Sequence, residues 1–367
     1  MLYENWSLYL NSEECIGISE FPMYSDITVT AELLEGMGPL SFHNSLPFRQ
    51  AKPGDVVIPV VVRVGFYLKP INPSFSKSSY SHYHGGWLPD EIAALMSLTL
   101  GARFYAGDSI REFDSYSNDP LGKPCFSNLV RPPVSNIPTH QRVLPEVCQR
   151  KDLRDLQFFA SFGKLNPEIA EKVIKCTRQY QNALWVAESN PELCWLLLIS
   201  AIEIAANEWA HNEQSEAYNL KNSYPELFDK LVQNGDDDLL NFTAETFGPI
   251  TKATAKFIKF CKCFCPDNLT QENSYGFKYS STKLSNALRT IYNHRSQALH
   301  GGIPFPAPMC APPDEHKLGE YRQVPNQLGI YMKGATWVGS DIPMNLHLFH
   351  FLTRKILMEW IRSLTSS

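Results

Sequence analysis

The stretch YNHRSQALHGG, residues 292–302, decides how the second half of this chain is interpreted. It closes residues 281–299, in which apolar side chains recur at helical spacing: Leu284, Leu288, Ile291 and Leu299. Gly301 and Gly302 follow, and glycine ends a helix easily because it adopts the left-handed turn without steric strain. The pattern therefore predicts a helix that stops at these two glycines.

Two chemically active side chains lie in the last two turns of this predicted helix. Arg295 and His300 are five positions apart, which places them roughly 140° apart around an ideal α-helix. They can border one cleft only if the helix end loosens. A guanidinium binds phosphate through a planar fork, and an imidazole transfers protons near neutral pH. The pair predicts a site that holds or cuts a phosphodiester. The alternative is a surface arginine and a helix-end histidine that the helix dipole favours.

Composition limits the classes of partner. The chain has 367 residues, of which 44% are hydrophobic and 19% charged, enough for a substantial core and for two domains. Its net charge of −5 excludes a protein that binds polyanions through its overall field. A nucleic-acid-binding surface would have to be a local basic patch.

Targeting signals are not evident in the sequence. Nine cysteines without the spacing of a disulfide framework favour a reducing, cytoplasmic location. The two most apolar runs are interrupted, one by Pro59 and Arg63 and the other by Glu203, so neither predicts a membrane span. The first 15 residues have no long apolar core and contain three acids, unlike a signal peptide: Glu4, Glu13 and Glu14.

The first 150 residues predict a mixed α/β domain of unknown role. Residues 26–33 and 55–68 are rich in β-branched and aromatic side chains, as strands are, and Pro59 places the second at an edge or a bulge. Residues 88–101 predict a helix with acids in its first turn. Prolines then recur between residues 114 and 145, which indicates an extended connector and a domain boundary near Arg150.

Residues 151–367 predict an all-α bundle, so that the fold class of the whole chain is α+β. Helical patterns span residues 167–188, 191–210, 224–233, 243–265, 281–300 and 344–364. A proline-rich excursion, residues 304–343, separates the last two helices and is long enough to carry a function of its own.

The predicted helix 191–210 carries one polar stripe. It is apolar almost all round, but Ser200, Glu203 and Asn207 fall within roughly 60° of one another on its surface. A carboxylate inside such a helix needs a partner, and Arg295 is the candidate. The alternative is that these three residues form a solvated edge.

The predicted helix 243–265 has a basic and an aromatic face. The basic stripe consists of Lys252, Lys256, Lys259 and Lys262, and the opposite face of Ile250, Phe257, Phe260 and Phe264. A lysine stripe is usually only a solvated face. Opposite a buried aromatic face, it can also line a groove for a nucleic-acid backbone.

No metal or cofactor site is predicted. The three cysteines of residues 261–265 alternate along a helix, so that successive thiols point about 200° apart and do not converge on one ion. Two histidine pairs fit a solvated loop and semi-buried structural positions, respectively: His82 with His84, and His347 with His350.

Residues 292–301, YNHRSQALHG, resemble the signature of the HEPN superfamily, in which an arginine, four to six intervening residues and a histidine end the last core helix. The tyrosine three positions before Arg295 and the glycine after His300 make the stretch most similar to the Apea-like HEPN branch. Residues 191–209 resemble the earlier core helix of that branch, with a glutamate in an apolar setting, and RKILMEWIRSL, residues 354–364, resembles its closing helix. The resemblance covers roughly residues 153–367.

The resemblance implies an all-α domain that dimerises. In active members of the superfamily it implies a metal-independent endoribonuclease that serves toxin–antitoxin or anti-phage defence systems. By position, Arg295 would bind the scissile phosphate and stabilise transition-state charge, His300 would transfer a proton, and Glu203 would orient Arg295. Substrate-binding roles would fall to Lys252, Lys256, Lys259, Asn207 and Tyr292.

The implied partners are RNA, a second copy of the chain, and an antitoxin or sensor protein, without a cofactor. The alternative is a non-catalytic HEPN module that binds RNA, a nucleotide or a partner protein. The intact pair of Arg295 and His300 favours the nuclease, whereas the net charge of −5 and the lack of an obvious aromatic platform for RNA favour the binding module.

Overall fold

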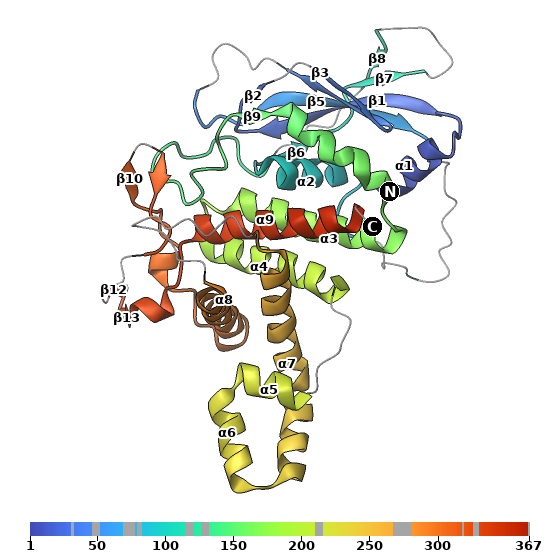
Figure 1. Cartoon of the computed structure of the whole chain (residues 1–367). Coiled ribbons are helices and arrows are strands. Elements are labelled where there is room, and N and C mark those ends of the chain that lie inside the picture. Colours follow the sequence, from blue (N-terminus) through green and yellow to red (C-terminus); the bar gives the residue numbers. More distant parts are fainter. Residues whose placement is uncertain are drawn as a thin grey trace. The chain divides into compact units, whose positions relative to one another are not determined.

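A computed structural model describes residues 1–30, 33–45, 52–68, 78, 83–114, 121–125, 132–209, 216–266, 280–317, 319–325 and 330–365. The chain is mixed α/β, with a sheet in its N-terminal part and a mostly helical C-terminal part (Figure 1). This coarse division of the fold class is confirmed, and the assignment of the helices to a HEPN-type bundle stays a prediction. In the described part of the chain, no helix is both long enough and apolar enough to span a membrane.

Two compact units make up the chain. The first unit consists of Met1–Leu198 with Ile361–Ser367, and the second of Ile199–Trp360. The division lies inside helix α4 (Pro191–Trp209), whereas the proline pattern predicts a boundary near Arg150. The assignment of separate roles to residues 1–150 and 151–367 stays a prediction, and each unit is described by itself below.

The first unit is built on an antiparallel sheet in the order β3-β4-β5-β1-β7-β8, with β6 also paired to β1. The strands are β1 (Gly17–Ser25), β3 (Leu33–Met37), β4 (Leu40–Asn44), β5 (Val57–Phe66), β6 (Tyr105–Ala106), β7 (Arg111–Phe113) and β8 (Lys123–Pro124). A separate parallel pair joins β2 (Val29–Thr30) to β9 (Lys151–Asp152). The strand predicted for residues 55–68 is confirmed as β5, and the strand predicted for 26–33 is reduced to β2 and the first residue of β3 among the described residues.

Pro59 explains a local irregularity of the sheet. Strand β5 is not an edge strand, because it pairs with β4 on one side and β1 on the other. The register to β1 shifts between the pairs Met23↔Val60 and Ser25↔Val57. Pro59 lies on the longer side of that shift, so the bulge, rather than the edge, accommodates a residue that cannot donate to the ladder.

In the described part of the first unit, the sheet is accompanied by α1 (Leu2–Leu10), α2 (Leu88–Leu100), the 3-10 helix η1 (Leu153–Lys164) and α3 (Pro167–Val186), and the unit also contains the start of α4 and the end of α9 (Leu346–Thr365). Helix α2 lies between the sheet and α3 (Figure 1). All its residues except Asp90 are buried, as expected for a helix that is covered on every side. It ends at Gly101, whose φ of 60° is left-handed.

A buried arginine holds this unit together just after α2. The Arg103 side chain is 0% exposed and donates from Nη1 to Asp26 Oδ2 at 2.9 Å, from Nη2 to Glu188 Oε1 at 3.0 Å, and from Nε to the Leu184 carbonyl at 2.8 Å. Glu188 also accepts the backbone N–H groups of residues 143 and 144. These bonds join residues on both sides of Arg150. The prolines therefore mark irregular backbone and not the limit of packing.

The second unit is mostly helical and contains residues 199–209 of α4, residues 346–360 of α9 (Leu346–Thr365), and the helices between them. These are α5 (Glu216–Ser223), α6 (Pro225–Asn234), α7 (Asp237–Phe264) and α8 (Ser281–Ser296). Helix α7 begins earlier than predicted because the Asp236 side chain accepts the Leu239 N–H and caps it. Helices α5, α6 and the start of α7 share a small core around Leu220, Leu231 and Ala244.

The proline-rich excursion between α8 and α9 has short structure of its own. It contains the hairpins β10 (Glu315–Lys317) with β11 (Glu320–Tyr321) and β12 (Ile330–Met332) with β13 (Ala335–Trp337). Two 3-10 turns, η4 (Ala307–Met309) and η5 (Gly339–Asp341), lie at its two ends.

Replacing the buried arginine should unfold the first unit readily. Arg103→Met removes the charge that compensates Asp26 and Glu188, and an uncompensated buried pair typically costs about 3–5 kcal/mol. Urea unfolding followed by tryptophan fluorescence measures the change in the free energy of unfolding. Arg154→Met is the matched control, because the Arg154–Asp152 pair lies on the surface and should leave the transition unchanged. Equal effects of the two substitutions would contradict a structural role of Arg103.

Candidate functional site

Helices α4 and α8 bring three of the predicted site residues together in the second unit. Tyr292 donates its hydroxyl to Glu203 Oε1 at 2.6 Å, and Arg295 Nη2 donates to Glu203 Oε2 at 3.0 Å. Each oxygen of the carboxylate thus has its own donor. The predicted pairing of Glu203 with Arg295 is confirmed, and the alternative that Glu203 belongs only to a solvated edge is excluded.

The positions on α8 explain how Arg295 is held. Residues 292 and 295 are three apart and share one helix face, and the guanidinium carbon lies 5.5 Å from the centre of the Tyr292 ring, within cation–π range. Tyr292 is 5% exposed and packs on Phe257 of α7, with ring centres 5.2 Å apart. The side chains of Arg295 and Glu203 are 23% and 19% exposed. The Arg295 side chain is therefore held by Tyr292 and Glu203 and is partly exposed to solvent.

The protonation state of Tyr292 is fixed by its surroundings. Burial raises the pKa of the Tyr292 hydroxyl well above its usual range, and the hydrogen bond to Glu203 raises it further. Tyr292 therefore remains a hydrogen-bond donor to Glu203 at all moderate pH values. In the described structure Glu203 is the hydrogen-bond partner of Arg295. A guanidinium has five N–H groups, so most of them are left for a ligand.

The end of α8 departs from α-helical geometry. Residues Gln297–Gly301 form a π-helical turn, η3, in which the Gly302 N–H bonds to the Gln297 carbonyl. Gly302 has a φ of 63°, so the helix stops at the predicted glycines through a left-handed residue. A π turn closes between residues i and i+5. The turn η3 begins after Arg295, so the angle of roughly 140° that an ideal α-helix predicts does not apply to His300.

His300 itself is exposed at the end of the π turn. Within the described structure, no hydrogen bond joins it to Arg295 or Glu203. The site thus consists of an anchored cation and, one turn beyond it, a histidine in solvent. This arrangement can hold an anion and place a proton carrier beside it.

The other predicted substrate-binding residues lie on α4 and α7. Asn207 is exposed one turn beyond Glu203 on the same helix. Lys259 is exposed, and its ammonium lies 5.7 Å from the centre of the Trp209 ring. Lys256 is half-buried. Lys252 belongs to α7, but its side chain lies outside the described residues.

His294, on α8, makes a contact that the sequence does not predict. His294 Nε2 donates to the carbonyl of Asp341 at 2.7 Å, and its ring lies 6.0 Å from that of Phe305. This contact ties the helix that carries Arg295 to the turn η5. The sequence holds no signal for it, because the partner is a backbone carbonyl far along the chain.

The predicted absence of a metal cluster can be compared with the described residues only. Among them, no group of three or more His, Cys, Asp or Glu side chains could hold an ion. His347 and His350 are buried more completely than the semi-buried positions predicted for them, and burial lowers the pKa of His347 to about 4. His82 lies outside the described residues.

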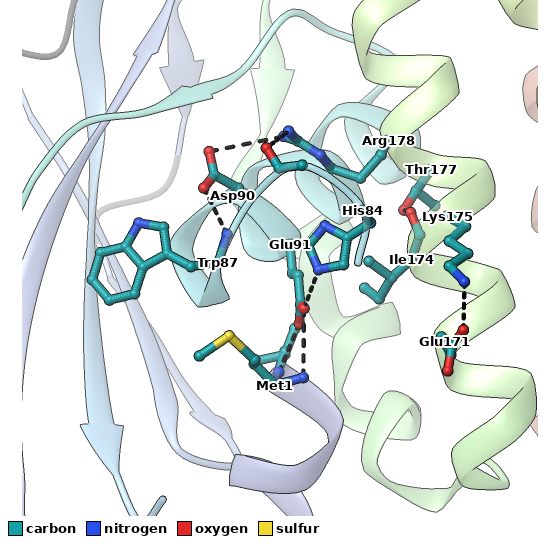
Figure 2. Close-up of polar contacts among 12 residues, drawn as sticks. Met1, His84, Trp87, Asp90, Glu91, Glu171, Ile174, Lys175, Thr177 and Arg178 are labelled. Atoms are coloured by element: carbon teal, nitrogen blue, oxygen red, sulfur yellow. Dashed lines mark hydrogen bonds and ion pairs between the residues drawn. The ribbon is translucent and has the colours of Figure 1, made fainter. Parts of the chain in front are cut away.

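The prediction of a solvated loop is wrong for His84, in the first unit (Figure 2). Its side chain is 7% exposed, and Nε2 lies 2.6 Å from Oε1 of Glu91, which is 3% exposed. Glu91 also accepts the Leu2 N–H at 2.6 Å and lies 3.5 Å from the Met1 amine. Burial raises the pKa of Glu91, but these donors, His84 foremost, outweigh it and leave the pKa below its usual value. The contact with the buried Glu91 carboxylate therefore accompanies the burial of His84.

Comparisons with known proteins give no relative: no family model, no curated protein and no solved structure matches this chain.

The anchored cluster should behave as one energetic unit. Glu203→Ala leaves the buried Tyr292 hydroxyl without its acceptor and removes the partner of Arg295, so the free energy of unfolding should fall by about 1–3 kcal/mol. A double-mutant cycle with Tyr292→Phe should give a coupling of at least about 0.5 kcal/mol. Denaturant titration measures both. Glu192→Ala, at an exposed position of the same helix, should have no effect, and an additive cycle would contradict the coupling.

Proposed function

We propose that this chain is a cytoplasmic, metal-independent endoribonuclease of the HEPN type, acting as a toxin or anti-phage effector through Arg295 and His300. The observation that supports it is the anchored arginine. Glu203 holds one edge of the Arg295 guanidinium at 3.0 Å, and the exposed His300 follows five residues later, in the π turn that ends the helix. The HEPN-like sequence frame adds the expected order of these residues along the chain.

The reaction is an internal transfer at phosphorus. The 2′-hydroxyl of the RNA attacks the adjacent phosphorus, the bond from phosphorus to the 5′-oxygen breaks, and a 2′,3′-cyclic phosphate and a 5′-hydroxyl result. Arg295 binds a non-bridging oxygen and stabilises the charge that grows on it. His300 takes the proton from the 2′-hydroxyl or gives one to the leaving oxygen. Glu203 and Tyr292 act through Arg295 by fixing its direction.

The proposed RNA path uses local charge. The net charge of −5 leaves binding to a local basic surface, for which Lys252, Lys256 and Lys259 of α7 are the candidates, with Asn207 of α4. The buried Tyr292 ring has little open surface for a base, so its contribution to binding runs through the Glu203 network.

A second copy of the chain completes the proposed site. In-line cleavage needs a base and an acid on opposite sides of the phosphorus, and one chain supplies one His300. A two-fold axis beside the motif provides both groups from one sequence, and closed two-fold dimers are the commonest soluble assemblies. An antitoxin or sensor protein would then restrain the nuclease until it is needed.

The second candidate function is a non-catalytic HEPN module that binds RNA, a nucleotide or a partner protein. The observation that favours it is the isolation of His300, which is exposed and has no hydrogen bond to Arg295 or Glu203 in the described structure. In that case Arg295 holds a phosphate and no bond is cut.

Loss of the histidine separates the two candidates. His300→Ala should reduce RNA cleavage by roughly 10²–10⁴-fold with an unchanged thermal unfolding midpoint, because His300 is exposed. Purified protein is incubated with labelled RNA in EDTA, and the ends are identified. Wild type should leave 2′,3′-cyclic or 3′-phosphate ends, and Asn293→Ala, at an exposed position of α8, should cut normally. Cleavage that requires magnesium and leaves 3′-hydroxyls would overturn the mechanism, and RNA binding without cleavage would favour the second candidate.

Assembly of two chains should be required for cleavage. Sedimentation of the purified protein should show a dimer, and the specific activity should fall when the protein is diluted through the dissociation constant of that dimer. Raising the protein concentration again should restore the specific activity. A folded monomer with undiminished specific activity would contradict a site shared between two copies.

A further inference from the structure

The first unit contains a cavity that the proposed nuclease does not use. Its volume is about 640 Å³, within the range of roughly 300–1,000 Å³ that is usual for small-molecule sites. It lies between α1, the first turn of α2 with the residues before it, and the first half of α3. Its lining consists of Met1, Tyr3, Glu4, Ser7, Leu8, His84, Glu91, Pro167, Glu168, Ala170, Glu171 and Ile174.

The lining combines apolar walls with negative charge. Leu8, Ala170 and Ile174 provide aliphatic surface, whereas Glu4, Glu91, Glu168 and Glu171 provide carboxylates. Among the described lining residues there is no lysine or arginine, and the Met1 amine, which also belongs to the lining, is already paired with Glu91 at 3.5 Å. Carboxylates that surround a concave, low-dielectric space concentrate a negative potential within it. The cavity therefore repels anions and favours a cation with an apolar body.

Two of the four carboxylates are already compensated. Glu91 has the donors described above, and Glu171 pairs with Lys175 at 2.6 Å across one turn of α3 (Figure 2). Glu4 and Glu168 are exposed, and neither has an ion pair in the described structure. Each lies in the first turn of its helix, where an acid also suits the helix dipole. Their charges remain available to a ligand.

His84 adds a buried polar atom without a partner to the same wall. Its Nδ1 has no hydrogen bond in the described structure, although the side chain is only 7% exposed. Nδ1 is therefore a polar atom of this wall that a ligand can pair with. The carboxylates are hydrogen-bond acceptors. A ligand that matches this cavity consequently brings hydrogen-bond donors.

We propose that this cavity is a binding site for a small organic cation, an aliphatic ammonium or guanidinium compound. Its charged end lies at the rim between Glu4 and Glu168, and its hydrocarbon body lies against Leu8, Ala170 and Ile174. The site is independent of the proposed nuclease activity, so that binding can be measured whether or not the chain cuts RNA.

Titration calorimetry on the full chain at low ionic strength tests the site with probes that share a four-carbon chain. Putrescine and agmatine are the cations, 1,4-butanediol is the neutral probe and succinate the anionic one. The two cations should bind saturably at one site per chain, and the diol and the diacid should not. Added salt should weaken the binding.

Two variants examine the position of the site. The double variant Glu4→Gln/Glu168→Gln should weaken cation binding about tenfold. Its matched control is Glu192→Gln/Glu226→Gln, at exposed acids in the first turns of α4 and α6, which should bind as wild type does. Ser7→Trp fills the cavity from a half-buried position without a change of charge and should abolish binding.

The outcomes that overturn the proposal are distinct from a folding defect. Circular dichroism and the unfolding midpoint identify any variant that fails to fold. No saturable binding of either cation to the folded wild type, equal binding of butanediol, or binding that persists in both folded cavity variants would each rule out the site. These results would leave the proposed nuclease untouched, because Arg295 and His300 lie in the second unit.

Discussion

The first unit depends on the burial of one guanidinium. A positive charge in a protein core is tolerated only when its hydrogen-bond donors and its charge are both matched. Arg103 meets this condition with two carboxylates and one carbonyl, contributed by residues 26, 184 and 188. Because each partner lies at the end of a strand or helix, the condition fixes where β1, α2 and α3 end relative to one another. Movement of any of these ends would leave a buried charge without its hydrogen-bond partner.

Arg103 and Arg295 both bind carboxylates through a guanidinium, but they differ in how many of their donors are used. All three kinds of nitrogen in Arg103 are engaged, and its side chain has no exposed surface, so it can bind nothing else. Arg295 has one carboxylate partner and is 23% exposed. Its direction is set by Glu203 and by the ring of Tyr292, and only one of its nitrogens has a hydrogen-bond partner in the described structure. A fully matched arginine stabilises a fold, whereas a partly matched one keeps donors that another group can use.

The features that the sequence predicts here are either local patterns or the consequence of a charged residue in an apolar helix. The helix of residues 281–299 and its glycine end follow from spacing, and the Glu203–Arg295 pair follows because a glutamate in an apolar helix requires a cation. The bonds of Arg103, the burial of His84 on Glu91, and the contact of His294 with Asp341 have no such signal, since each joins residues far apart. Proline content likewise describes the backbone near Arg150 but not what packs against it.

The π turn after α8 shows why a residue count alone is a poor guide to a site. In a continuous α-helix, five positions would leave Arg295 and His300 roughly 140° apart, and four positions would have suited a common face better. The chain instead ends in the wider π turn of Gln297–Gly301, and Gly302 stops the helix directly after it. In a π turn the angle between successive residues is smaller than in an α-helix. The same number of residues therefore leads to a different side of the helix end, and the local helix type has to be known before two side chains are assigned to one face.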